Sequence, residues 1–157
     1  MIELKGSEKL PVLIKKAHIR VNTGLSTLSQ VLSWFAELYE PRIPTSVWIR
    51  CQLALAEGFT NAVRHAHQGK APDLPVDIEV AVFTEYLEIK IWDSGDPFDL
   101  EQKIKDMSGQ RDIYAPGGRG LQLINDIADS ISYERMPDRR NCLSIVKNYS
   151  PSLNDQK

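Results

Sequence analysis

Apolar residues recur every three or four positions through the middle of the chain, which is the spacing of one face of an α-helix. The pattern centres on residues 53–67, LALAEGFTNAVRHAH, and its apolar positions are Val47, Cys51, Leu55, Phe59, Ala62, Val63 and Ala66. Glu57 and Asn61 are four residues apart, so a helix projects both from the same side. This polar pair suits a metal–phosphate site, and a solvated polar stripe accounts for it equally well.

Two further residues of this helix bear on its surroundings. Gly58 costs about 1 kcal/mol relative to alanine in mid-helix, so we expect neighbouring backbone to approach the helix closely there. His65 extends the polar stripe by one turn, and it either leans towards the phosphates of such a site or packs against the lid-like stretch at residues 93–118, with packing or a supporting role favoured.

The rest of the chain divides into strands and helices by the same criterion. Alternating apolar and polar residues predict strands at residues 10–21, 76–83, 86–92, 131–135 and 142–147. Helical spacing predicts a helix from residue 25 to about 39, a short one at 99–107 and a buried one at 120–128. The long irregular stretch 93–118 is typical of a functional lid or a disordered segment.

This order of elements predicts an α+β fold. We expect a two-layer α/β sandwich with helices on one face of a mixed, mainly antiparallel sheet. At 157 residues the chain is expected to form one domain, residues 1–150, followed by a polar tail at 151–157.

Composition narrows the functional classes. The net charge of -2 gives no general reason to expect direct nucleic-acid binding. Cys51 and Cys142 lack metal-ligand spacing, so both are expected to be buried thiols in a reducing compartment. No apolar run approaches membrane-spanning length and no signal-peptide pattern is seen, so a cytoplasmic protein that does not contact the membrane is expected.

Three separated motifs contain the candidate chemistry. They are E-x-x-x-N-A at Glu57, Asn61 and Ala62, then D-x-G-x-P-F-D at Asp93, Gly95, Pro97, Phe98 and Asp99, and finally G-G-x-G-L-x-L-I at Gly117, Gly118, Gly120, Leu121, Leu123 and Ile124. An aspartate before a glycine turn is common in Asx-type turns, and a glycine cluster before a helix is common in loops. Such a cluster can also present backbone N–H groups to phosphate.

Together, in this order, the motifs resemble the N box and the two glycine boxes of the histidine-kinase-like ATPase superfamily, whose nucleotide-binding unit is the Bergerat fold. Within it the chain is most similar to the anti-sigma factor serine/threonine kinases of bacterial partner switching. That similarity rests on the single-domain length, the N-terminal strand and helix, the N-A-x-x-H-A form of residues 61–66 and the terminal hairpin, and it covers roughly residues 8–148.

The resemblance implies a role for each box. Asn61 would coordinate Mg²⁺ next to the ATP phosphates, and Glu57 would be the general base. Asp93 would accept a hydrogen bond from the adenine amino group, which favours ATP over GTP, and Gly95 would let the backbone pass close to the base. The second glycine box would hold the phosphates through Gly117, Gly118, Gly120 and the following Leu121. The sequence contains no G-x-x-x-x-G-K-[ST] motif, so a P-loop is not available.

Two arginines are candidates for stabilising the transferred phosphoryl group, Arg119 in the glycine box and Arg111 in the lid. Each is equally compatible with a surface position on a loop. The chain also departs from the family pattern, because the loop at residues 138–141 lacks the Gly-Thr pair that many relatives carry before the last strand. Ser144 or a water molecule is a candidate substitute for that threonine.

The function implied is an ATP-binding anti-sigma factor that phosphorylates a serine or threonine of an anti-anti-sigma antagonist and sequesters a sigma factor. The alternative is a nucleotide-controlled protein-binding regulator without significant kinase activity. The catalytic half of a histidine kinase is disfavoured, because no dimerisation helix with a phospho-acceptor histidine precedes the domain. The N-terminal strand and helix are a possible homodimer interface.

Overall fold

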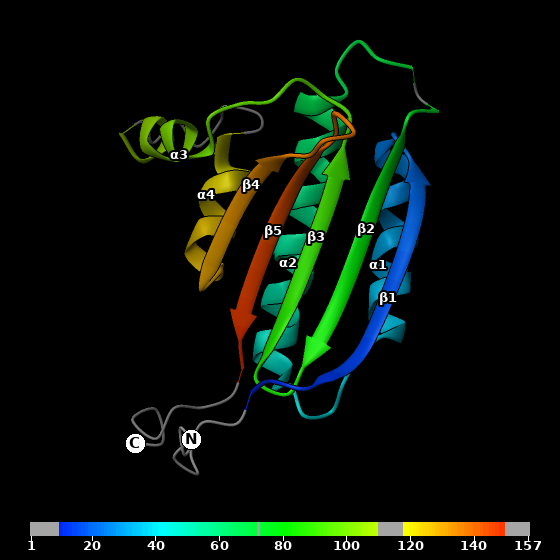
Figure 1. Ribbon diagram of the computed structural model, residues 1–157, viewed down its shortest axis with the longest axis vertical. Helices are drawn as coiled ribbons and strands as arrows, with labels where there is room; N and C mark the ends of the chain where they lie inside the picture. Colours follow the sequence, from blue (N-terminus) through cyan, green and yellow to red (C-terminus); the bar gives the residue numbers. More distant parts are fainter. Residues whose placement is uncertain (1–9, 72, 110–117, 150–157) are drawn as a thin grey trace, which may run out of the picture.

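The computed structural model describes residues 10–71, 73–109 and 118–149 (Figure 1). The strands are β1 (Leu13–Asn22), β2 (Pro75–Phe83), β3 (Tyr86–Asp93), β4 (Ser130–Arg135) and β5 (Asn141–Asn148). The helices are η1 (Leu25–Thr27), α1 (Leu28–Glu37), α2 (Thr45–Asn61), η2 (Ala62–Ala66), α3 (Leu100–Gly109) and α4 (Gly118–Ile127). The predicted order of elements is therefore confirmed within the described part of the chain.

The strands form one five-stranded sheet in the order β1-β2-β3-β5-β4. Each neighbouring pair is antiparallel, and β5 lies between β3 and its own hairpin partner β4. Helices α1, α2 and α4 all lie on one face of this sheet (Figure 1). The structure confirms the predicted two-layer α+β sandwich. Among the described helices, none is both long and apolar enough to cross a membrane.

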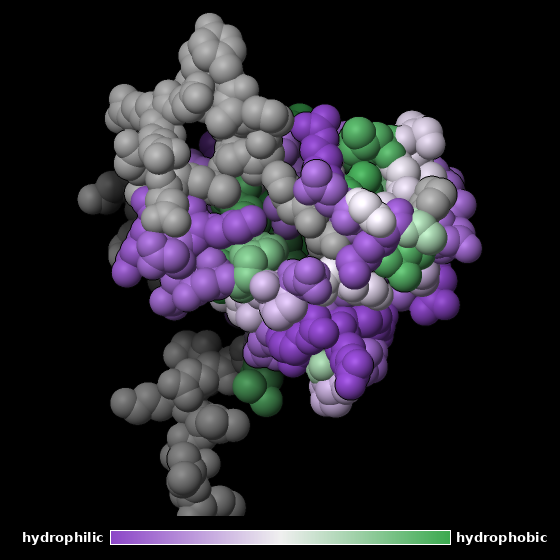
Figure 2. All heavy atoms as spheres, turned by 90° about the horizontal axis from the view of Figure 1, so that it is seen from above, coloured by the Kyte–Doolittle hydropathy of each residue, from purple (hydrophilic) through white to green (hydrophobic). Residues whose placement is uncertain are grey.

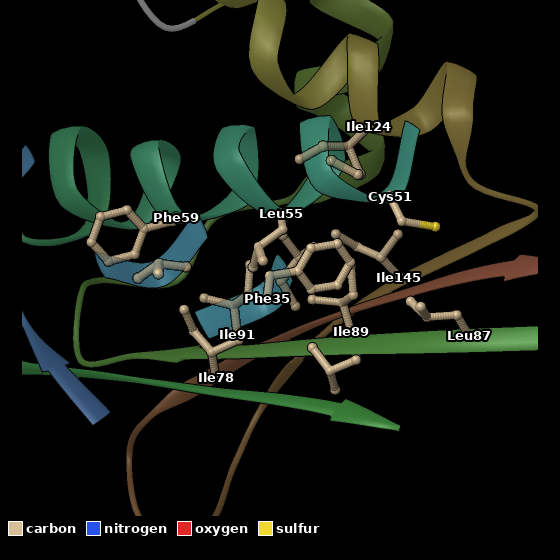
Figure 3. Packing of buried hydrophobic residues seen from close by; sticks show 14 of the residues in the cluster. Phe35, Cys51, Leu55, Phe59, Ile78, Leu87, Ile89, Ile91, Ile124 and Ile145 are labelled. Atoms are coloured by element: carbon tan, nitrogen blue, oxygen red, sulfur yellow. The ribbon is translucent and has the colours of Figure 1, made fainter. Parts of the chain in front are cut away.

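The core lies between α2 and the sheet because both present apolar residues at their natural periods. Leu55 and Phe59 project from α2 towards Ile89 and Ile91 of β3, and all four are fully buried (Figure 3). Burial of a side chain of this size contributes about 1.5–3 kcal/mol. These contacts hold α2 against the centre of the sheet.

Gly58 allows α2 to lie this close to the sheet. A Cβ atom at this position would lie 2.5 Å from Cδ1 of Ile91. The expectation of a close approach is thus confirmed, but the approaching group is a side chain of β3. The sequence-based expectation of neighbouring backbone was wrong, because Cδ1 of Ile91 in β3 fills the space that the missing Cβ leaves.

The central helix changes its geometry at Asn61. The predicted helix 53–67 is an α-helix only to Asn61, and Ala62–Ala66 form a π-helical turn. Within that turn the His67 N–H donates to the carbonyl of Ala62, five residues earlier, at 3.0 Å. Hydrophobic periodicity did not predict this turn, because one turn of wider helix barely alters the apolar pattern.

The sheet face that no described helix covers carries an ion cluster around Asp77 of β2. Arg20 of β1 donates to both carboxylate oxygens, at 2.8 and 3.1 Å, and His18 Nε2 lies 3.0 Å from Oδ1. Arg140, in the turn before β5, donates to Oδ2 at 2.9 Å and is itself paired with Asp138. One buried carboxylate therefore links β1, β2 and the β4–β5 turn.

Candidate functional site

The three motifs meet at one end of the sheet. The last turn of α2, the end of β3 and the first turn of α4 all lie at the upper end of the molecule in Figure 1. Figure 2 looks onto this end and shows mainly hydrophilic residues with hydrophobic residues visible between them. The elements that carry Glu57, Asn61, Asp93 and Gly120 therefore reach the same region, as a shared site requires.

Asn61 is a buried polar residue whose side-chain oxygen is unpaired. The residue is 8% exposed, and Oδ1 has no hydrogen-bond partner among the described residues. Leaving a buried acceptor unsatisfied costs about 1–3 kcal/mol. A neutral oxygen of this kind is a suitable ligand for Mg²⁺, which binds few protein groups and takes its other ligands from phosphates and water. The residue fits the metal role that the resemblance implies.

Glu57, one turn before Asn61, lies directly beneath the first turn of α4. A Cβ atom on Gly120 would lie 2.9 Å from Oε2 of Glu57, so only a glycine leaves this carboxylate undisturbed. The first N–H groups of a helix have no partner within the helix and favour anions such as phosphate. A carboxylate and a helix N-terminus thus adjoin at the site.

The rest of the second glycine box is only partly described. Gly118 is the first residue of α4, whereas Gly117 and Arg111 lie outside the described residues, as does the side chain of Arg119. Leu121 is fully buried in the core. Its side chain therefore packs beneath the site, and only its backbone is available to a phosphate.

Asp93 ends β3 and is held by two donors on a single oxygen. It is 4% exposed, and Oδ1 accepts hydrogen bonds from the Gly95 N–H and from Nδ2 of Asn141, both at 2.9 Å. Within the described residues, these bonds to Asp93 all use Oδ1. The carboxylate is therefore oriented by the protein, and these two hydrogen bonds do not use its Oδ2.

Asn141 is a site residue that sequence reasoning missed. The β3–β5 register pairs it with Asp93, and its amide also donates to the Gly95 carbonyl at 2.8 Å. Arg135 of β4 donates to the same carbonyl and to Oδ1 of Asn141, both at 3.1 Å. Asn141, the first residue of β5, therefore holds the Asp93 carboxylate in a chain that lacks the Gly-Thr pair.

The suggestion that Ser144 replaces that threonine was wrong. Side chains alternate along a strand, so Ser144 lies on the opposite face of β5 from Asn141. Its hydroxyl lies 3.7 Å from the Cys142 sulfur, away from Asp93. Asn141 is the first residue of β5. This position identifies it as the partner of Asp93 only when the register between β3 and β5 is known.

His67 was not predicted from the sequence, whereas His65, which was, has its side chain outside the described residues. His67 is 2% exposed, and its Nε2 accepts a hydrogen bond from the Ser94 N–H at 2.9 Å. Its Nδ1 contacts the Thr23 hydroxyl, which in turn donates to the Leu74 carbonyl. Burial lowers the pKa of His67, Asp93 opposes that shift and Lys70 adds to it.

An aromatic pair lies beside this turn. Phe98, from the first glycine box, stacks on Tyr133 of β4 with ring centroids 4.3 Å apart, and Lys103 of α3 lies 4.5 Å from the Phe98 centroid. Burial and the nearby Asp93 raise the pKa of Tyr133, so its hydroxyl stays protonated at neutral pH. The stack anchors the segment that leads from Asp93 into α3.

Comparison with known proteins identifies the family to which the chain is similar. The profile described as "Histidine kinase-like ATPase domain" matches residues 21–147. The chain is 33% identical over 114 residues to a protein named serine-protein kinase RsbW from Bacillus pumilus, covering 69% of this chain and 67% of that protein. It is 35% identical over 85 residues to the Bacillus subtilis protein of the same name, covering 51% of this chain and 52% of the relative.

A solved structure supports the fold. A chain in the crystal structure of the SiaB–SiaC complex from Pseudomonas aeruginosa matches with a TM-score of 0.53 and 15% identity, covering 83% of this chain and 89% of that one. At this identity the likeness concerns the fold alone. The family profile, by contrast, spans most of the chain and contains all three motifs. The protein belongs to the histidine kinase-like ATPase family.

Proposed function

We propose that this protein binds ATP with Mg²⁺ and transfers the γ-phosphoryl group to a serine or threonine of an anti-anti-sigma protein. We further propose that it holds a sigma factor inactive by binding it. The kinase proposal depends on two observations. Glu57 and Asn61, whose Oδ1 has no partner among the described residues, project from the same side of α2, and the Glu57 carboxylate lies against the first turn of α4. A proton acceptor, a metal ligand and a phosphate-binding helix end then lie together.

Each residue has a distinct task in this proposal. Glu57 accepts the proton of the attacking hydroxyl, whose oxygen bonds to the γ-phosphorus as the bond to the departing ADP oxygen breaks. Asn61 would hold Mg²⁺, which would supply positive charge where the phosphoryl group accumulates negative charge. Asp93 accepts a hydrogen bond from the adenine amino group through Oδ2. A guanine presents a carbonyl at that position, and two acceptors repel each other.

The protein partners are proposed on the resemblance to partner-switching kinases and on the relatives named serine-protein kinase. The relatives are partly covered by the match, so their activity is not transferred as a whole. A nucleotide-controlled binding role without phosphoryl transfer uses the same pocket. Transfer of label and formation of a complex therefore have to be measured separately.

The first test incubates the protein with labelled ATP and candidate anti-anti-sigma proteins from the same genome. Glu57→Ala is expected to reduce label transfer by about 10²–10⁴-fold, the usual contribution of a general base, while ATP still binds. Glu37→Ala is the matched control, because Glu37 ends α1 at the opposite end of the sheet. Transfer at the wild-type rate by the Glu57 variant would remove the assigned base.

The same mixtures report on the second role when sigma factors are added and complexes are isolated. ATP-dependent complex formation together with label transfer supports both parts of the proposal. Complex formation that depends on nucleotide without any transfer by the wild type would replace the kinase with a nucleotide-controlled binding protein. Absence of ATP binding by the wild type would overturn both.

A further inference from the structure

The hydrogen bonds around His67 define its protonation state. The backbone N–H of Ser94 can only donate, so the Nε2 atom that receives it, at 2.9 Å, must carry a lone pair. The proton of the neutral ring is then on Nδ1 and is donated to the Thr23 hydroxyl. That hydroxyl uses its own proton for the Leu74 carbonyl. One arrangement of protons, in which the ring is neutral, gives every group in this series of hydrogen bonds a partner.

This arrangement joins three segments that are distant in sequence. Ser94 lies between Asp93 and Gly95, whose N–H orients the Asp93 carboxylate. Thr23 follows β1, and Leu74 precedes β2. The imidazole therefore fixes the turn at residues 93–95 through the Ser94 N–H. Asn141 and Arg135 fix the same turn from the β4–β5 hairpin.

We propose that His67 is a positioning residue for nucleotide binding: its neutral ring holds the turn at residues 93–95 so that Asp93 presents Oδ2 to the base, and protonation of Nε2 releases that turn. The inference rests on the proposed function, in which Asp93 binds adenine. It adds a residue that has no contact with the nucleotide in that role. It also adds a dependence of ATP affinity on pH.

The direction of the pH dependence follows from the ring's surroundings. A protonated ring has N–H groups on both nitrogens, so Nε2 would confront the Ser94 N–H with a second donor. Among the described residues, the charged groups that act on the ring are Asp93, which favours the proton, and Lys70, which opposes it. Burial outweighs Asp93 and holds the pKa below its usual 6.5. ATP affinity is thus expected to be constant above about pH 6.5 and to fall as the pH drops further.

Matched substitutions separate the two hydrogen bonds of the ring. In His67→Gln the amide oxygen reaches the place of Nε2 and can accept the Ser94 N–H. In His67→Asn the shorter amide reaches only the place of Nδ1, so the bond to Thr23 is retained and the bond to Ser94 is lost. His67→Leu loses both. His18→Gln is the control, because His18 is exposed on the opposite face of the sheet.

The measurement is the dissociation constant for ATP with Mg²⁺ between pH 8 and pH 5, divided by that of His67→Gln at each pH. The ratio removes the titration of the nucleotide itself. We expect a ratio near one at pH 8 and a rise towards about fivefold weaker binding by the wild type as the His67 ring becomes protonated below pH 6.5, the equivalent of one net hydrogen bond. His67→Asn and His67→Leu are expected to bind about fivefold more weakly than the wild type at pH 8.

Nitrogen NMR of the histidine rings tests the geometry without nucleotide. We expect an unprotonated Nε2 at His67 at neutral pH and a shift of the Ser94 amide when the ring titrates. A ratio that stays flat while the ring is seen to titrate, equal affinity of the wild type and His67→Leu, or a proton on Nε2 at neutral pH would each overturn the inference. ATP binding by the wild type would still support the proposed function in each of these cases. Failure of the wild type to bind ATP at any pH would overturn both.

Discussion

In the proposed function, Asn61 is the residue whose metal-binding role opposes the stability of the fold. Its buried Oδ1 has no described partner, so the folded protein bears the cost of an unsatisfied acceptor until a ligand arrives. Removing the acceptor removes that cost. A residue kept for packing would show the reverse behaviour, because truncation of a well-packed side chain destabilises the fold.

We expect Asn61→Ala to leave the free energy of unfolding without nucleotide unchanged within about 0.5 kcal/mol or to raise it. The variant should lose the stabilisation that ATP with Mg²⁺ gives the wild type, which is about 2.7 kcal/mol at 100 times the dissociation constant. Urea unfolding with and without nucleotide measures both quantities, and Thr60→Ala on the same turn is the control. A loss of more than about 2 kcal/mol without nucleotide would mean that Asn61 is a packing residue.

Single residues were predictable from the sequence where chemistry and local spacing suffice. The shared side of Glu57 and Asn61 follows from helix geometry, and the position of Asp93 follows from the end of a strand. Asn141 and His67 were not predictable in this way. Their partners, Asp93 and Ser94, lie 48 and 27 residues away, and no local pattern reports which strands become neighbours.

At the scale of elements, the contact between α2 and β3 depends on a missing side chain. Gly58 lowers the helix propensity of α2, and the space it leaves is filled by Cδ1 of Ile91. Glycine therefore sets the distance between the helix and the sheet. The cost to the helix is offset by the burial of an isoleucine at the centre of the core.

We expect Gly58→Ala to destabilise the protein by about 1–2 kcal/mol, because overpacking outweighs the gain in helix propensity. Ile91→Val removes the atom that an alanine would meet and by itself costs about 0.5–1.5 kcal/mol. The double variant should be more stable than the sum of the two effects predicts. Urea unfolding of the four proteins gives the coupling energy, and additivity would show that the two positions do not compete for the same space.

Element types were predictable from hydrophobic period because each strand and helix buries one face. Element boundaries and partners were less so. The switch from α- to π-helix after Asn61 depends on whether the His67 N–H bonds four or five residues back, which no pattern of apolar residues encodes. The pairing of β5 with β3 is likewise not encoded in the apolar pattern of either strand.

At the scale of the molecule, the ion cluster on the uncovered sheet face makes the free energy of unfolding depend on pH in the acidic range. Burial alone would raise the pKa of Asp77, but the hydrogen bonds and charge of Arg20, with His18 and Arg140, outweigh it and lower the pKa below its usual 3.8. A carboxyl group whose pKa is lowered by folding stabilises the fold at pH values above its pKa in the unfolded chain. That contribution is lost as the pH falls through the folded value.

Asp77→Asn is therefore expected to lower the free energy of unfolding by about 1–2 kcal/mol at pH 7, because the cations of the cluster are partly solvated. The difference from the wild type should shrink as the pH falls below about 4. Unfolding by urea at several pH values measures it. A difference that is constant down to pH 2 would mean that the carboxylate charge is not what stabilises the sheet.

The wide turn at Ala62–Ala66 connects Asn61, the proposed metal ligand, to His67, which hydrogen-bonds the backbone next to Asp93. It begins directly after Asn61 and delivers His67 to the turn that carries Asp93. Each residue of a regular helix advances the side-chain direction by about 100°. Gain or loss of one residue here would rotate the imidazole away from Ser94, and the proposed metal ligand Asn61 would no longer be fixed relative to Asp93. Over evolution, this segment should accept exchanges of side chain far more readily than any change in its length.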